Sequence, residues 1–193
     1  MLKRALLCAT LAVSLAGCVS LGGETPDQLL TLTAARTVPA GASSTGQAAS
    51  ALAVIEPGAD LRLAVTRVPV QMTDSSLAYL EDAVWVDKPT RLFQRLLGET
   101  IRAKGNRLVV GEGDLGYAAA TKLSGELLDM GYDVATGSVV VRYDGVLQLP
   151  DGRVTTRRFE SRVPGIVAET AAVGPALNQA ANQVADEVAE WVG

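Results

Sequence analysis

The side chains of this sequence best suited to acid–base chemistry or calcium binding are four carboxylates, Glu126, Asp129, Asp133 and Asp144. Two carboxylates held a few ångströms apart can cleave a glycosidic bond, and several together can bind Ca²⁺. Their segments, however, alternate polar with apolar residues, as the solvent-exposed face of a sheet does. We therefore favour an exposed sheet face over a catalytic or metal site.

The sequence contains no histidine, and its two cysteines are Cys8 and Cys18. Histidine is the commonest general base and zinc ligand, so Ser-His-Asp and Cys-His arrangements are excluded. Cys8 lies in the export signal argued below, and Cys18 is expected to carry lipid. Neither would provide a free thiol in the mature chain, which excludes thiol catalysis as well. We expect no catalytic residue, no cofactor and no metal site. A hydrolase using a serine–lysine or carboxylate pair is the enzymatic alternative, and no motif supports it.

Residues 111–116 carry glycines in the GxGxxG pattern of dinucleotide-binding loops, and they follow a predicted strand. Such a site needs a helix directly after the glycines, so that the helix N-terminus faces the pyrophosphate. Residues 117–120 are too few for that helix before the next predicted strand begins. We expect a flexible loop here and no nucleotide site.

Positive charge is concentrated in the last predicted strand, at Arg153, Arg157, Arg158 and Arg162. These arginines could contact lipid phosphates or an acidic partner, or they could protect a solvated edge strand from pairing. Tyr79 and Trp85 could form a second contact site, for acyl chains or for another protein. Packing in the core is the default interpretation for such aromatic side chains.

The first 17 residues predict an export signal. Lys3 and Arg4 precede an uncharged run at 5–15, which is shorter than the roughly 20 residues that a membrane-spanning helix needs. Residues 15–18, Leu-Ala-Gly-Cys, resemble the bacterial lipobox, in which a peptidase cuts before a cysteine that carries diacylglycerol. The mature chain would begin at Cys18. The alternative is ordinary cleavage or an uncleaved anchor, with Cys18 unmodified.

By analogy with lipoproteins, Cys18 also gains an acyl chain on its new amino group, and several chains together anchor a protein durably. Lipoproteins retained at the inner membrane usually have Asp after the cysteine, whereas this sequence has Val19. We therefore expect a lipid anchor at the periplasmic face of the outer membrane. Loss of Lys3 and Arg4 lowers the formal charge from −4 to −6, which makes nucleic acid an unsuitable partner.

After a tether at 18–27, residues 28–193 have the length of one domain. Residues 34–50 are mostly small and predict a flexible loop. Patterns of β-branched, aromatic and alternating apolar residues predict strands at 28–33, 51–55, 61–65, 67–70, 77–87, 107–110, 121–133, 138–149 and 153–163. Apolar residues at helical spacing predict helices at 89–105 and 172–192.

The first helix and the strand after it suggest a unit similar to βαβ, whereas the later strands are joined by a tight turn at 150–152. The predicted fold class is therefore α/β. We expect a single domain with a mostly antiparallel sheet and two main helices packed on it.

The order of these features resembles a known family. After the lipobox come an early strand, a low-complexity gap, the segment 67–70, and the segment from Leu77 through Trp85 to the helix at Pro89. The strand containing Arg158-Phe159 and the closing helix at 178–191 complete the order. Together these features resemble the ABC-type transport auxiliary lipoproteins.

The resemblance implies a non-enzymatic component of a phospholipid transport system that works between the inner and outer membranes. Its implied partners are an ABC permease, its ATPase and a mammalian-cell-entry (MCE) domain protein. The resemblance is also compatible with a homo-oligomer. The implied fold is similar to the TolB amino-terminal domain. The alternative is a structural envelope lipoprotein that helps to assemble an outer-membrane complex.

Overall fold

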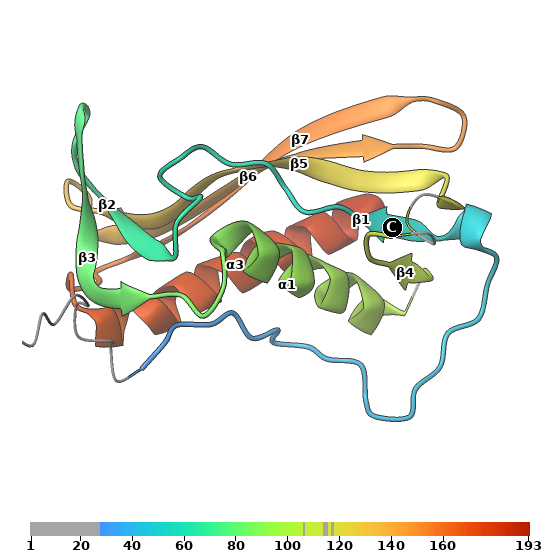
Figure 1. Ribbon diagram of the computed structural model, residues 1–193, viewed down its shortest axis with the longest axis horizontal. Coiled ribbons are helices and arrows are strands. Elements are labelled where there is room, and N and C mark those ends of the chain that lie inside the picture. Colours follow the sequence, from blue (N-terminus) through green and yellow to red (C-terminus); the bar gives the residue numbers. More distant parts are fainter. Residues whose placement is uncertain (1–27, 106, 114–115, 117) are drawn as a thin grey trace, which may run out of the picture.

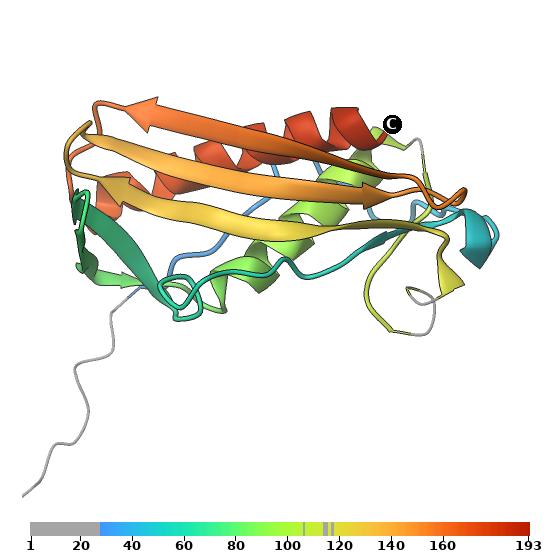
Figure 2. The ribbon, with the colours of Figure 1, turned by 90° about the horizontal axis from the view of Figure 1, so that it is seen from above.

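A computed structural model describes residues 28–193 except 106, 114, 115 and 117. In the described chain two long helices cover one face of a seven-stranded mixed sheet (Figures 1 and 2). The helices are α1 (Pro89–Lys104) and α3 (Thr170–Val192), and η1 (Ala48–Ser50) is a short 3-10 helix. The strands are β1 (Leu52–Val54), β2 (Arg67–Thr73), β3 (Ser76–Val84), β4 (Val109–Val110), β5 (Thr121–Asp133), β6 (Ser138–Gln148) and β7 (Val154–Pro164).

Helix α1 begins and ends where the sequence predicts. Pro89 occupies the first turn, where its missing N–H is not needed, and Gly105 closes the helix in the left-handed conformation with φ 73°. Its apolar residues form one buried face, which includes Leu92, Phe93 and Leu97. The predicted helix against the sheet is confirmed.

Helix α3 buries a stripe of small and branched residues that includes Leu177, Val184 and Val188. It packs on β6 and β7 and against α1, so both helices lie on the same face of the sheet. The opposite face of the sheet is not covered by either helix, and Figure 2 views the domain from that side.

The long strand β5 is the centre of the sheet. It pairs with β6 in antiparallel register from Lys122↔Gln148 to Asp133↔Ser138, and β6 pairs with β7 in the same way. On its other edge, β1 pairs in parallel with the first residues of β5, and β2 pairs in parallel with the last. Strand β3 then pairs with β2 and β4 with β1. The parallel pairings are short, so most of the paired length is antiparallel, as predicted.

Three sequence predictions about local structure are wrong. Residues 28–33 form no strand, because only Leu30 makes a bridge, to Trp85. Residues 61–65 form turns, because the Asp60 carboxylate accepts a hydrogen bond from the Arg62 amide and the Asp60 carbonyl accepts one from the Leu63 amide. The predicted βαβ-like unit also differs, since β4 pairs with β1 and not with the strand directly before α1.

The segment from residue 30 to residue 38, here called the strap, runs in extended form along the helices. Asn178 and Asn182 of α3 accept hydrogen bonds from the amides of Thr33 (2.8 Å) and Ala35 (2.7 Å). The carboxylate of Glu99 in α1 accepts one from the Val38 amide at 2.8 Å. Composition alone predicts a flexible loop from residue 34, and it does not indicate these partners.

An aromatic row runs through the core between the sheet and the helices. The ring centroids of Phe93 and Tyr143 are 5.3 Å apart, and those of Phe159 and Trp191 are 5.5 Å apart. The Tyr143 hydroxyl donates a hydrogen bond to the Ser124 carbonyl at 2.6 Å, and burial raises the pKa of this phenol well above its usual value. The row therefore ties β5, β6 and β7 to both helices.

Candidate interaction surface

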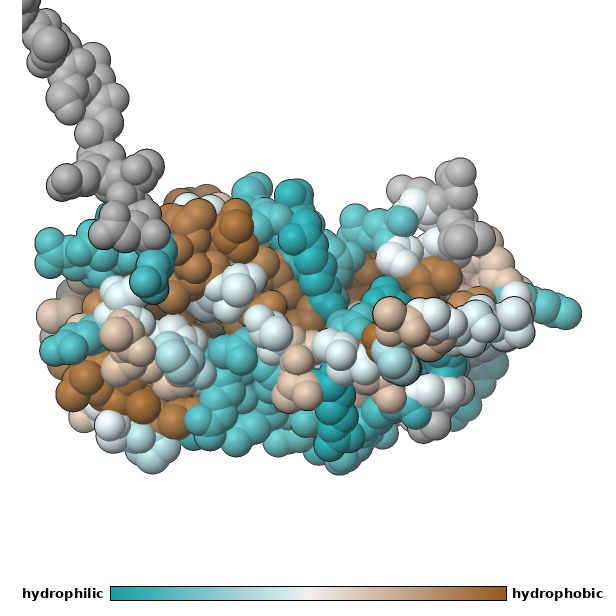
Figure 3. Space-filling model, turned by 90° about the horizontal axis from the view of Figure 1, so that it is seen from below, coloured by the Kyte–Doolittle hydropathy of each residue, from teal (hydrophilic) through white to brown (hydrophobic). Residues whose placement is uncertain are grey.

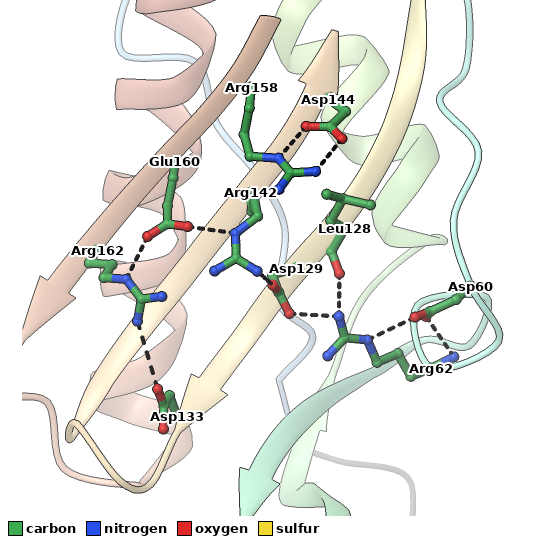
Figure 4. Close-up of polar contacts among 10 residues, drawn as sticks. All are labelled: Asp60, Arg62, Leu128, Asp129, Asp133, Arg142, Asp144, Arg158, Glu160 and Arg162. Carbon is green, nitrogen blue, oxygen red and sulfur yellow. Dashed lines mark hydrogen bonds and ion pairs between the residues drawn. The ribbon is translucent and has the colours of Figure 1, made fainter. Parts of the chain in front are cut away.

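The uncovered face of the sheet carries a connected set of charges, which we call the charge ladder (Figure 4). Cross-strand register creates it, because Asp129 of β5 stands opposite Arg142 of β6, and Arg142 stands opposite Glu160 of β7. Opposite charges on neighbouring strands attract across the short gap between strands. The ladder comprises Asp60, Arg62, Asp129, Asp133, Arg142, Glu160 and Arg162.

Arg142 is the centre of the ladder. Its guanidinium contacts the carboxylate of Asp129 and that of Glu160, each at 2.5 Å. From Glu160 the ladder continues to Arg162 at 2.6 Å, and from Asp129 to Arg62 at 2.7 Å. A β-bulge between Leu127 and Asp129 turns Asp129 toward this face.

Neighbouring guanidinium groups keep two carboxylates of this face ionised. Burial opposes ionisation of Glu160, but hydrogen bonds from Arg142 and Arg162 outweigh it and lower the pKa of Glu160. The pKa of Asp144 is lowered chiefly by its hydrogen bonds from Arg158, at 2.6 Å. A general acid needs the opposite shift, because it must hold a proton near neutral pH.

Three of the four predicted carboxylates pair with arginine, whereas Glu126 takes part only through its backbone. Asp129, Asp133 and Asp144 each form an ion pair, and Glu126 lies at the bridge to Gly58. In the described part of the chain, no group of three or more acidic, histidine or cysteine side chains is arranged to hold a metal ion. Geometry therefore supports the interpretation of an exposed sheet face.

The predicted arginine cluster is divided between the two faces of β7. Arg158 and Arg162 lie on the open face in ion pairs, and Arg153 pairs with Asp151 in the turn before the strand at 2.6 Å. Strand alternation places Arg157 on the opposite face, with its guanidinium 5.0 Å from the centre of the Phe159 ring. Because β7 pairs only with β6 among the described strands, these charges line an edge strand.

Tyr79 and Trp85 are not brought together with the arginines. Trp85 is 1% exposed and belongs to the core, which is the default interpretation of the sequence pattern. Tyr79 is partly exposed on β3, with the Arg67 guanidinium 5.0 Å from its ring centre. Strand β3 lies at the opposite edge of the sheet from β7. Of the two aromatic residues, only Tyr79 is available for a surface contact.

The glycine-rich loop at 111–116 is described only in part. At Gly116 an added Cβ would lie 2.4 Å from the Gly111 carbonyl oxygen, so this glycine allows two backbone segments to approach closely. Glu112 accepts a hydrogen bond from the Glu56 amide at 2.8 Å. Packing within the loop thus accounts for Gly116 without a nucleotide.

Sequence reasoning missed the basic and acidic partners that complete the ladder, namely Asp60, Arg62, Arg142 and Glu160. Arg142 stands between the apolar residues Val141 and Tyr143 in a strand, which is the signal that could have identified it. Glu160 lies between Phe159 and Ser161 and carried no such signal. Arg62 stands between Leu61 and Leu63 in the same way as Arg142, but it lies in a turn and not in the predicted strand, so strand alternation could not have placed it on this face.

Comparison with known proteins identifies the family. Residues 30–189 match the family model described as the ABC-type transport auxiliary lipoprotein component. The chain belongs to this family. The match begins at the residue that bridges Trp85 and ends in the last turn of α3, so it covers almost the whole described domain. The resemblance inferred from the sequence is confirmed.

Solved structures show the same fold. Protein XCC0632 from Xanthomonas campestris is similar with a TM-score of 0.69 and 22% identity, over 86% of this chain and 94% of that one. An uncharacterized protein has a TM-score of 0.66 and 13% identity, over 86% of this chain and 100% of that one. A PelC dodecamer from Paraburkholderia phytofirmans reaches a TM-score of 0.44, which is too low to support an argument. No curated protein matches the sequence.

Proposed function

We propose that this family member is a lipid-anchored periplasmic component of an ABC-type system that moves phospholipid between the inner and outer membranes. The observation that carries the proposal is the family match over residues 30–189, which follows a lipobox ending at Cys18 after a short tether. Both the lipobox and Cys18 lie outside the described residues. The MCE-domain protein is the partner that we expect the domain to meet, together with the permease and ATPase.

The open sheet face is the surface we propose for docking. It carries both signs of charge in fixed positions, and such a pattern selects a complementary partner and its orientation more than it adds affinity. Among the described residues, no helix covers this face (Figure 2). The domain would then act by binding and not by chemistry. Within the described chain, no helix combines the length and apolar character that crossing a membrane requires.

Crosslinking in intact cells tests this function. A photo-crosslinking amino acid at Arg158, on the open face, is expected to capture a component of an ABC transport system. The same substitution at Arg157 is the matched control, because alternation places this neighbouring residue on the opposite face. Partners would be identified by mass spectrometry. Capture of an outer-membrane β-barrel or a peptidoglycan-binding protein would instead support the structural envelope lipoprotein.

Placement in the outer membrane gives a separate prediction. The substitution Val19→Asp creates the residue that usually retains lipoproteins at the inner membrane. We expect the protein to move from the outer-membrane to the inner-membrane fraction on density-gradient separation, whereas Val19→Ala should leave it in place. An unsubstituted protein that already fractionates with the inner membrane would contradict the proposed location.

A further inference from the structure

One end of the domain gathers most of its exposed apolar side chains. Nine large apolar residues are exposed in the described chain, and the backbone pairings given below place six of them at the end where that chain begins. Figure 3 shows apolar surface gathered at this end. The six are Leu29, Met72, Leu77, Val86, Val134 and Val167. We call this surface the apolar end.

Hydrogen bonds place the six residues at one end although they are distant in sequence. Leu29 and Val86 flank the bridge between Leu30 and Trp85, and Met72 and Leu77 belong to the hairpin of β2 and β3. The Val134 amide donates to the Gln71 carbonyl at 3.0 Å, which joins the turn after β5 to that hairpin. The Ile166 amide donates to the Gly137 carbonyl, which brings the segment before α3 to the same turn.

The apolar end is also the end closest to the expected anchor. Leu30 exchanges hydrogen bonds of 2.8 Å with Val84 and Val86, and the strap continues this attachment along the helices. Ten residues, 18–27, separate the start of the mature chain from the first described residue. Ten residues span at most roughly 35 Å when fully extended. A short linker of this kind holds the two linked sites at an effective concentration on the order of millimolar.

We infer that the apolar end rests on the lipid surface into which Cys18 is inserted, so that the domain is held in one orientation by its anchor and by a second, non-covalent contact. This inference rests on the lipid anchor of the proposed function. Exposed apolar patches mark sites that contact membranes or proteins, and the high effective concentration makes even a weak contact persist. The hairpin of β2 and β3 carries Asp74, Glu81 and Asp82 against one basic residue, Arg67, so zwitterionic headgroups are favoured over anionic ones.

Orientation gives the inference a sharp test, because Val134 and Val154 are exposed valines near opposite ends of β6. Val154 pairs with Gln148, the last residue of β6, whereas Val134 precedes its first residue. A strand of eleven residues is roughly 35 Å long, so lipid contact at one valine keeps the other away from the membrane.

The experiment uses the full lipidated protein reconstituted into vesicles of phosphatidylcholine and phosphatidylethanolamine. Because the sulfur of Cys18 carries diacylglycerol and Cys8 is removed with the signal, Val134→Cys and Val154→Cys each provide one reactive thiol for an environment-sensitive fluorophore. We expect the emission of the Val134→Cys label to shift to shorter wavelength and to be quenched by lipids that carry a nitroxide. The Val154→Cys label should show neither change.

The outcomes separate this inference from the proposed function. Vesicle-bound protein in which both labels behave as in water, or in which both shift equally, overturns the fixed orientation and leaves the lipid anchor intact. Protein that does not sediment with vesicles overturns the anchor and the inference together. Leu61→Cys is the control, because Leu61 is exposed and lies outside the apolar end. If the orientation holds, the emission of its label should remain that of a fluorophore in water.

Discussion

Gly125→Ala is expected to destabilise the domain by at least about 4 kcal/mol, enough to leave much of the protein unfolded. Gly125 has φ 146°, a conformation that residues with a side chain rarely adopt. An added Cβ would lie 1.9 Å from the carbonyl oxygen of Asp144 on the neighbouring strand and 3.0 Å from the Tyr143 hydroxyl. Strand β5 would have to separate from β6 to make room, and the hydrogen bond from Tyr143 to Ser124 would be lost with it.

Urea unfolding followed by circular dichroism measures this effect, and Gly152→Ala is the matched control. Gly152 also has a positive φ, of 84°, but nothing lies within 4 Å of its added Cβ. Its replacement should therefore cost only the conformational strain, about 1 kcal/mol. Equal losses at the two positions would show that backbone conformation alone, and not the contact with Asp144, explains the need for glycine at residue 125.

Cys18→Ser is expected to abolish the lipid anchor. A single acyl chain binds a membrane only marginally, whereas the several chains expected on a mature lipoprotein hold it firmly. Without the thiol no diacylglycerol can be attached, so the protein should leave the membrane pellet or retain its uncut signal. Membrane sedimentation together with the mass of the amino-terminal peptide distinguishes these two products.

Cys8→Ser is the control for the anchor, because Cys8 would be removed with residues 1–17. This variant should be processed, acylated and sedimented like the unsubstituted protein. A mature protein that begins at another residue, or that carries an unmodified thiol at Cys18, would contradict the lipid anchor and the function built on it. Family membership would still stand, because it depends on residues 30–189.

Local patterns predicted the regular elements best where they were long. Strands β5, β6 and β7 and helices α1 and α3 lie within a few residues of their predicted bounds. The alternation of Val139, Val141 and Tyr143 toward the core is confirmed by their complete burial. Long elements repeat their pattern several times, so one misleading residue does not change the assignment.

Short segments were predicted less well, because few residues define their pattern. Residues 61–65 are a short, mostly apolar segment of the kind that forms a strand, but Leu61 is 87% exposed and only Leu63 is fully buried. The Asp60 side chain and backbone hold this segment in turns. Such competition between side-chain and backbone hydrogen bonds is not visible in hydropathy.

The charge ladder depended on information that no local pattern contains. In β5 the buried positions are odd-numbered up to Leu127 and even-numbered from Met130, because the bulge shifts the alternation. Only after this shift does Asp129 point to the same face as Arg142. The pairing of Arg142 with Glu160 further requires the register of β6 with β7.

The sequence by itself determined the family, the absence of histidine chemistry, the long elements and the expected lipid site at Cys18, since each of these depends on residue types and on neighbours in the chain. Tertiary structure decided which charges neutralise one another, that Trp85 is buried, and that Leu29, Met72 and Val134 share one end. These properties depend on strand register and on contacts between residues that are distant in sequence. Free energy of packing and pairing selects such contacts across the whole domain, so no single segment encodes them.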